Sequence, residues 1–174
     1  MNSNLLLGFG TLAFFFWLSR RDNVNTKMRL DTLINAVLDA DRRFPNADTD
    51  IKRTAVRIAE TVQRHAEEVI EHMQSVGDVP WLLSHIGKSG TDLLKRAQAL
   101  HMLELRTVEA GMTKPGDDQI ILATKNIVDF SFAEMEQTVK QYASLVPGED
   151  GQISILKRSF TEYDHFRNDW RNEF

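Results

Sequence analysis

The stretch DIKRTAVRIAETVQRHAEEVIEHMQSV, residues 50–76, decides the fold class. Its apolar side chains recur at alternating steps of four and three residues, at Ala55, Ala59, Val62, Ala66, Val69, Met73 and Val76. This spacing is typical of an amphipathic helix with a heptad-like seam, and the small residues in the seam allow a second helix to approach closely. Because the pattern stops at Gly77, it predicts one helix of a hairpin or bundle rather than a long coiled coil.

The same helical spacing continues on both sides of this stretch. We predict longer helices at 26–44, 91–110, 118–146 and 152–172, and a short one at 81–86. Gly87 and Gly90 predict a break between the short helix and the next one, with Thr91 as the N-cap of the latter. No segment shows sustained strand alternation. The predicted fold class is therefore all-α, with an N-terminal hydrophobic helix followed by a four- to five-helix up-down bundle with short loops.

The first 19 residues contain no charged side chain, and residues 5–18 read LLLGFGTLAFFFWL. As a helix, the apolar run spans about 21 Å and the whole uncharged stretch about 28 Å, while a hydrocarbon core is roughly 30 Å thick. We therefore predict a transmembrane anchor with a basic flank at 1–21, ahead of a soluble helical domain at 22–174. The anchor residues are Leu5, Leu6, Leu7, Phe9, Leu12, Phe14, Phe15, Phe16, Trp17, Leu18, Arg20 and Arg21.

The basic pair Arg20-Arg21 predicts the orientation of this anchor, because basic flanks are kept on the cytoplasmic side. The short N-terminus would lie outside and the body in the cytoplasm. A cleaved signal peptide would carry its basic residues before the apolar run, and an interfacial helix would have a polar face. A signal peptide fits less well because the basic pair follows the apolar run. An interfacial helix fits less well because Phe14 to Trp17 cover every face. The sequence does not separate a lipid span from a helix buried in a protein assembly.

Composition limits the function further. The chain has 21 basic and 25 acidic side chains, a net charge of −4, and every charge lies from Arg20 onward. A mildly acidic body without a basic patch argues against nucleic acid as a partner. The absence of cysteine excludes disulfides, thiolate metal ligands and a cysteine nucleophile. No G-x-S-x-G elbow or glycine-rich phosphate loop is present, so we expect neither a cofactor nor enzymatic activity.

Histidines offer the main candidate chemistry. His65 and His72 share one side of a helix, and Glu68 lies within reach of both, so the three could hold a metal ion. Ion pairing and hydrogen bonding beside the small-residue seam explain the trio more simply, and we predict no metal site. His101, on an apolar stripe, is predicted to be a hydrogen-bonded core residue. A ferritin-like di-metal site needs two Glu-x-x-His motifs, whereas the chain has one, which ends at His165. The least unsuitable ligands for such a site are Glu68, His72, Glu104 and His165.

The C-terminal segment carries an aromatic stripe at steps of three and four residues. Aromatic residues with interspersed arginines are enriched at interface hot spots, so the stripe predicts docking to a partner. The alternative is that it closes the core of the bundle itself. The predicted docking residues are Phe160, Tyr163, Phe166, Trp170 and Phe174.

Together these features predict a membrane-tethered, non-enzymatic structural or interaction subunit of a larger assembly, such as a secretion, respiratory, photosynthetic or virion complex. Its partners would be the lipid membrane and either other proteins of the complex or further copies of the chain. A membrane-anchored regulator or sensor is the first alternative. A ferritin-like metal-binding helical protein is the second.

Overall fold

The computed structural model describes residues 24–142 and 150–172. In these residues the chain forms five helices and no strand, which confirms the predicted all-α bundle. The first helix covers residues 24–43. The others are α2 (Thr49–Ser75), α3 (Val79–Glu109), α4 (Asp117–Tyr142) and α5 (Asp150–Asn172).

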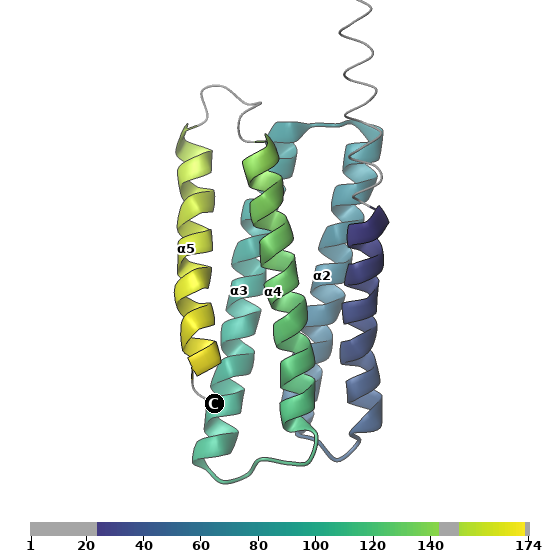
Figure 1. Ribbon diagram of the computed structural model, residues 1–174, viewed down its shortest axis with the longest axis vertical. Helices are drawn as coiled ribbons and strands as arrows, with labels where there is room; N and C mark the ends of the chain where they lie inside the picture. The colour runs from purple at the N-terminus through teal and green to yellow at the C-terminus, as the bar shows by residue number, and fades with distance from the viewer. Residues whose placement is uncertain (1–23, 143–149, 173–174) are drawn as a thin grey trace, which may run out of the picture.

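The helices lie side by side and alternate in direction along the chain (Figure 1). The turn between α2 and α3 lies at one end of the bundle, which we call the upper end, and the first helix begins toward that end. The loops at 44–48 and 110–116 lie at the opposite end, which we call the lower end. The order is therefore up-down, as the short loops predict.

Apolar side chains from all five helices form the core. The main cluster includes Val37, Ile58, Leu100, Ile127 and Tyr163, which are 0–4% exposed. A second cluster near the upper end contains Leu82, Leu83, Ile86, Val139 and Leu156. The predicted seam of α2 enters the core through Ala55, Ala59 and Val62 and leaves it at the C-cap residue Val76, which is exposed.

The predicted break at Gly87 and Gly90 is wrong, because α3 is one continuous helix of 31 residues. A glycine inside a helix costs only about 1 kcal/mol relative to alanine, which packing can outweigh. A β carbon at position 87 would lie 3.3 Å from Leu156 Cδ2, and one at position 90 would lie 3.7 Å from Phe132 Cε1. The two glycines thus allow α5 and α4 to approach α3 closely.

The predicted N-cap at Thr91 is also wrong. The Thr91 hydroxyl donates to the Gly87 carbonyl 2.9 Å away, inside the helix. The N-cap of α3 is Asp78, whose carboxylate accepts from the Trp81 N–H at 3.2 Å. Pro80 occupies the first turn, where its missing N–H costs no helical hydrogen bond.

Within residues 24–142 and 150–172, no helix has an apolar stretch long enough to cross a bilayer. The predicted anchor at 1–21 lies outside the described residues. The boundary between anchor and soluble domain lies outside them as well.

Candidate functional site

Two His-x-x-Glu pairs lie on neighbouring helices, one half-buried and one buried. His65 and Glu68 belong to α2, toward the upper end, and His101 and Glu104 belong to α3, toward the lower end. Residues three apart share one side of a helix, so each histidine lies next to its glutamate. The surroundings of the two pairs differ, and that difference determines what each can do.

The upper pair is joined by His85 from the first turns of α3. Glu68 Oε2 lies 3.5 Å from His65 Nδ1 and 3.5 Å from His85 Nε2. The three candidate ligand atoms all lie within 4.8 Å of one another. The imidazole rings meet edge to face, with centroids 5.4 Å apart. Two nitrogens and one carboxylate oxygen thus face a common point.

The other ring nitrogen of His65 faces a second carboxylate. His65 Nε2 lies 3.6 Å from Asp92 Oδ2. Asp92 is held in turn by the Arg96 guanidinium, whose Nε donates to both carboxylate oxygens at 3.2 Å. His65 therefore lies between a carboxylate on its own helix and one on α3.

Three imidazole nitrogens of this upper cluster lack hydrogen-bond partners. Nδ1 and Nε2 of His65 and Nε2 of His85 are all buried from solvent, and none makes a hydrogen bond. Burial lowers the pKa of the His85 imidazole, and the neighbouring His65 lowers it further, while Glu68 acts in the opposite direction. The surroundings therefore favour a neutral His85.

His72 does not join this cluster, which corrects the predicted trio of His65, Glu68 and His72. Its ring stacks on Trp81 with centroids 3.7 Å apart, and Trp81 stacks on His85 at 4.7 Å. The indole thus lies between His72 and His85. Helical spacing correctly places His72 on the same side of α2 as His65 and Glu68. However, α3 contributes Trp81, which lies between His72 and His85, and it contributes His85, which Glu68 contacts.

The lower pair has a complete set of partners. Glu104 is 5% exposed, and its Oε2 accepts from the Trp170 indole Nε1–H at 2.8 Å. The same oxygen lies 3.3 Å from His101 Nδ1, and the Lys125 ammonium donates to Oε1 at 3.4 Å. Lys125 also donates to the Trp170 carbonyl at 3.0 Å. The predicted core role of His101 is confirmed, and the network joins α3, α4 and α5.

The four ligands considered for a ferritin-like site are not brought together. Glu68 contacts His85, whereas Glu104 lies 19 positions farther along α3 than His85, about 28 Å at 1.5 Å per residue. His72 stacks on Trp81, and His165 is exposed on α5. One metal centre could not contact both glutamates.

The aromatic stripe of α5 packs largely against its own bundle. Tyr163 and Trp170 are 4% and 3% exposed, and Phe160 and Phe166 pack against the core. Tyr163 stacks on Phe132 at 3.7 Å and donates its hydroxyl to Asp129. The stripe thus closes the core at these four positions, which was the alternative interpretation. Docking of a partner stays a prediction, and Phe174 lies outside the described residues.

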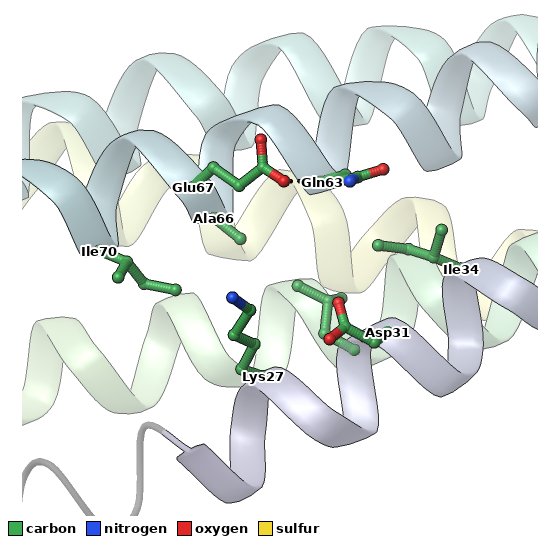
Figure 2. A pocket seen from close by; sticks show the side chains of 8 residues that line it. Lys27, Asp31, Ile34, Gln63, Ala66, Glu67 and Ile70 are labelled. Atoms are coloured by element: carbon green, nitrogen blue, oxygen red, sulfur yellow. Dashed lines mark hydrogen bonds between the residues drawn. The ribbon is translucent and has the colours of Figure 1, made fainter.

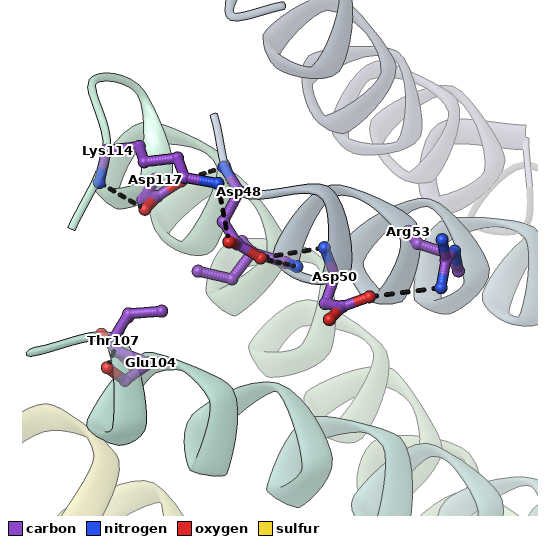
Figure 3. Close-up of polar contacts among 8 residues, drawn as sticks. Asp48, Asp50, Arg53, Glu104, Thr107, Lys114 and Asp117 are labelled. Atoms are coloured by element: carbon purple, nitrogen blue, oxygen red, sulfur yellow. Dashed lines mark hydrogen bonds and ion pairs between the residues drawn. The ribbon is translucent and has the colours of Figure 1, made fainter. Parts of the chain in front are cut away.

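A third polar group joins the two loops of the lower end (Figure 3). Asp117, which is 1% exposed, accepts from the backbone N–H of Asp48 at 2.7 Å and from that of Lys114 at 2.8 Å. The Lys114 ammonium donates to Asp48 Oδ2 at 3.1 Å. Asp48 also caps α2 by accepting from the N–H groups of Asp50 and Ile51. Because every carboxylate has donors, the group is structural.

Two surface hollows lie between helices of the described chain. One, between the first helix and α2, has a volume of about 10 Å³ and is lined by Lys27, Asp31 and Glu67 among others (Figure 2). The other, beside Asp129 and Arg167, has a volume of about 50 Å³. Sites for small organic ligands usually measure about 300–1,000 Å³, so neither hollow accommodates such a ligand.

No family model, curated protein or solved structure matches this chain. Sequence reasoning missed His85 and Asp92 as members of the upper cluster. The signal for His85 was its position four residues after Trp81, which places both on one face of α3.

Proposed function

We propose that this chain is a non-enzymatic subunit that tethers a helical bundle to a membrane and holds it on a larger assembly. The observation that carries the proposal is the uncharged apolar stretch at 1–19, followed at once by Arg20 and Arg21. By the retention of basic flanks in the cytoplasm, the bundle would lie on the cytoplasmic side and the short N-terminus outside.

The position of residue 24 supports a defined orientation of the bundle. Three residues from Arg21 to Val24 span at most about 10 Å, and the first helix, which covers residues 24–43, begins toward the upper end (Figure 1). An anchored bundle would therefore turn its upper end, with the α2–α3 turn, toward the membrane. The loops at 44–48 and 110–116 would face away from it.

Exposed apolar side chains support contacts at both ends. Val24, Met28 and Val76 are 56–67% exposed and belong to segments of the upper end. Met102, Val108, Met112 and Leu122 are 48–62% exposed and belong to the last turns of α3, the following loop and the first turns of α4. In the proposal the first group faces the headgroups, and the second is available to a partner protein, since exposed apolar surface marks such contacts when it is contiguous.

The tether is tested by deleting residues 1–19 and comparing membrane and soluble fractions. We expect the full chain to resist carbonate extraction and the deletion variant to become soluble with an unchanged helical circular dichroism spectrum. A matched control exchanges Met102 and Leu122 for serine and should stay in the membrane. Membrane attachment of a folded deletion variant would contradict the tether.

The assembly is tested by isolating the full chain from its native membrane in mild detergent and identifying co-purifying proteins by mass spectrometry. We expect a small set of partners in fixed stoichiometry. The serine variant at positions 102 and 122 should lose them if the lower end is the docking surface. A single monodisperse chain would contradict the assembly and leave the regulator or sensor as the better function.

A further inference from the structure

We propose that His65, Glu68 and His85 bind one divalent transition-metal ion of the zinc class. The ligands would be Nδ1 of His65, Oε2 of Glu68 and Nε2 of His85. This inference goes beyond the tether and does not depend on it, since it rests on two helices of the bundle. Two imidazoles and one carboxylate are a ligand set that zinc, cobalt and iron(II) accept.

The distances match the edges of a coordination sphere better than they match hydrogen bonds. Both nitrogen–oxygen separations are 3.5 Å, while hydrogen bonds between such atoms usually measure about 2.7–3.2 Å. Ligand bonds of about 2.0–2.1 Å at tetrahedral angles place neighbouring donor atoms about 3.3 Å apart. The distances from Glu68 Oε2 to the two histidine nitrogens are therefore almost those between neighbouring ligands of one metal ion. Binding would draw the two histidines together.

The buried nitrogens provide an independent argument. Nearly all buried polar atoms in proteins have a hydrogen-bond partner, yet three ring nitrogens of His65 and His85 have none. Two of these nitrogens are the proposed ligand atoms. A metal ion would accept their lone pairs, which requires the two imidazoles to be neutral when it binds.

Asp92 and Arg96 provide the outer support that metal-binding histidines usually have. A metal-bound imidazole commonly donates its other N–H to a carboxylate, which fixes the tautomer and the ring orientation. His65 Nε2 faces Asp92 Oδ2 at 3.6 Å, and Asp92 is held by the Arg96 guanidinium. With Nδ1 on the metal, His65 would be oriented from both sides.

The site would keep one position open. Three protein ligands leave room for a fourth in a tetrahedral sphere, and the Glu68 side chain is 46% exposed, so water can approach from its side. The Trp81 ring stacks on His85, with ring centroids 4.7 Å apart, and restricts movement of the imidazole.

The test uses the full chain, free of any histidine tag, in detergent micelles after treatment with EDTA. Zinc is titrated by calorimetry at pH 7.5, and cobalt(II) is followed by its visible absorption. We expect one ion per chain, micromolar or tighter affinity, and the intense cobalt bands of a four-coordinate site. A zinc Kd weaker than about 1 mM in folded protein would overturn the proposal.

Matched variants distinguish the proposed ligands His65, Glu68 and His85 from the trio that helical spacing alone suggests, which has His72 in place of His85. His85→Gln should weaken zinc binding by more than about 100-fold, and Asp92→Asn by about 10–100-fold, as losses of outer support do. His72→Gln and His165→Gln should change the affinity less than about threefold. Circular dichroism confirms folding of each variant, and Asp92→Asn serves as the second test if His85→Gln does not fold.

Unchanged affinity in folded His85→Gln, or loss of binding in His72→Gln alone, would overturn the assignment. A further readout is tryptophan fluorescence, because Trp81 stacks on a proposed ligand. Cobalt(II) should quench the full chain more than the Trp81→Phe variant. Equal quenching in the two proteins would place the ion elsewhere.

Discussion

The two His-x-x-Glu pairs of this bundle share a local sequence and differ in what the other helices bring to them. Around Glu104, α4 contributes an ammonium and α5 an indole N–H, so the carboxylate is surrounded by donors. Around His65 and Glu68, α3 contributes a second imidazole and a second carboxylate, and three of the histidine nitrogens make no hydrogen bond. The same motif is thus a structural joint at the lower end and a candidate cation site at the upper end.

The comparison shows that donor supply, rather than the motif, decides the role of a buried pair. Breaking a buried charge network costs much, because the remaining charges stay desolvated, while loss of a half-exposed carboxylate costs little. Glu104 has a 6% exposed side chain and Glu68 a 46% exposed one. The two glutamates should therefore contribute unequally to stability.

The largest expected effect is that of Glu104→Gln. It removes the buried anion that accepts from the Trp170 indole and the Lys125 ammonium, and we expect a loss of about 3 kcal/mol in the free energy of unfolding. The melting temperature should fall by about 10 °C. Thermal and denaturant unfolding of the EDTA-treated protein measure both quantities.

Glu68→Gln is the matched control for this comparison. We expect a change of less than about 1 kcal/mol, because the carboxylate is already half solvated. Equal losses in the two variants would show that the upper pair is as strongly coupled as the lower one, and the comparison would fail.

A smaller loss of stability is expected for substitution of Asp48. It tests whether a carboxylate with hydrogen-bond donors also stabilises the loops of the lower end. Asp48→Ala removes the N-cap of α2 and should cost about 1 kcal/mol, whereas Asp48→Asn retains the cap.

Burial raises the pKa of Asp48, but the Lys114 ammonium and the N–H groups of Asp50 and Ile51 outweigh it and lower the pKa below 3.8.

This lowered pKa gives the cap a pH dependence of known sign. A carboxyl with a lower pKa in the folded state stabilises the protein above its unfolded pKa and loses that contribution as pH falls through the folded value. The native protein should therefore lose more stability than Asp48→Asn on acidification below about pH 4. Parallel acid curves for the two proteins would contradict a charged role for Asp48.

The smallest expected effect is the pH dependence of the upper cluster without metal. Burial, and then His65, lower the pKa of His85, so the unfolded chain takes up a proton before the folded one as pH falls below 6.5. The free energy of unfolding should decline as the pH falls from 6.5 to the pKa of His85 in the folded protein. Below that pKa, His85 should contribute no further decline. His85→Gln should remove this component, as unfolding in EDTA between pH 5 and 8 would show. An identical decline in that variant would assign the effect to another histidine.

The seam of α2 shows how far sequence reasoning reaches in the fold. Ala55, Ala59 and Val62 are buried as their spacing predicts, because helical periodicity is a local property. The break predicted at Gly87 and Gly90 failed because a glycine preference is worth about 1 kcal/mol, and close packing of α4 and α5 on α3 outweighs it.

The candidate site shows the same limit. The sequence put His65 and Glu68 on one face, and the structure confirms that contact at 3.5 Å. It offered His72 as the second histidine and missed His85, because which histidine reaches Glu68 depends on how α3 lies against α2. Trp81, which lies between the two rings, decides it.

By itself, the sequence determined the helical class, the seam of α2 and the placement of His65 and Glu68 on one side of α2. These depend on the 3.6-residue repeat, which acts within a few turns of one helix. Tertiary structure alone decided that Trp170 and Lys125 complete the lower pair and that His85 and Asp92 surround the upper one. Those contacts join side chains far apart in sequence, and they are set by the register in which packed helices meet.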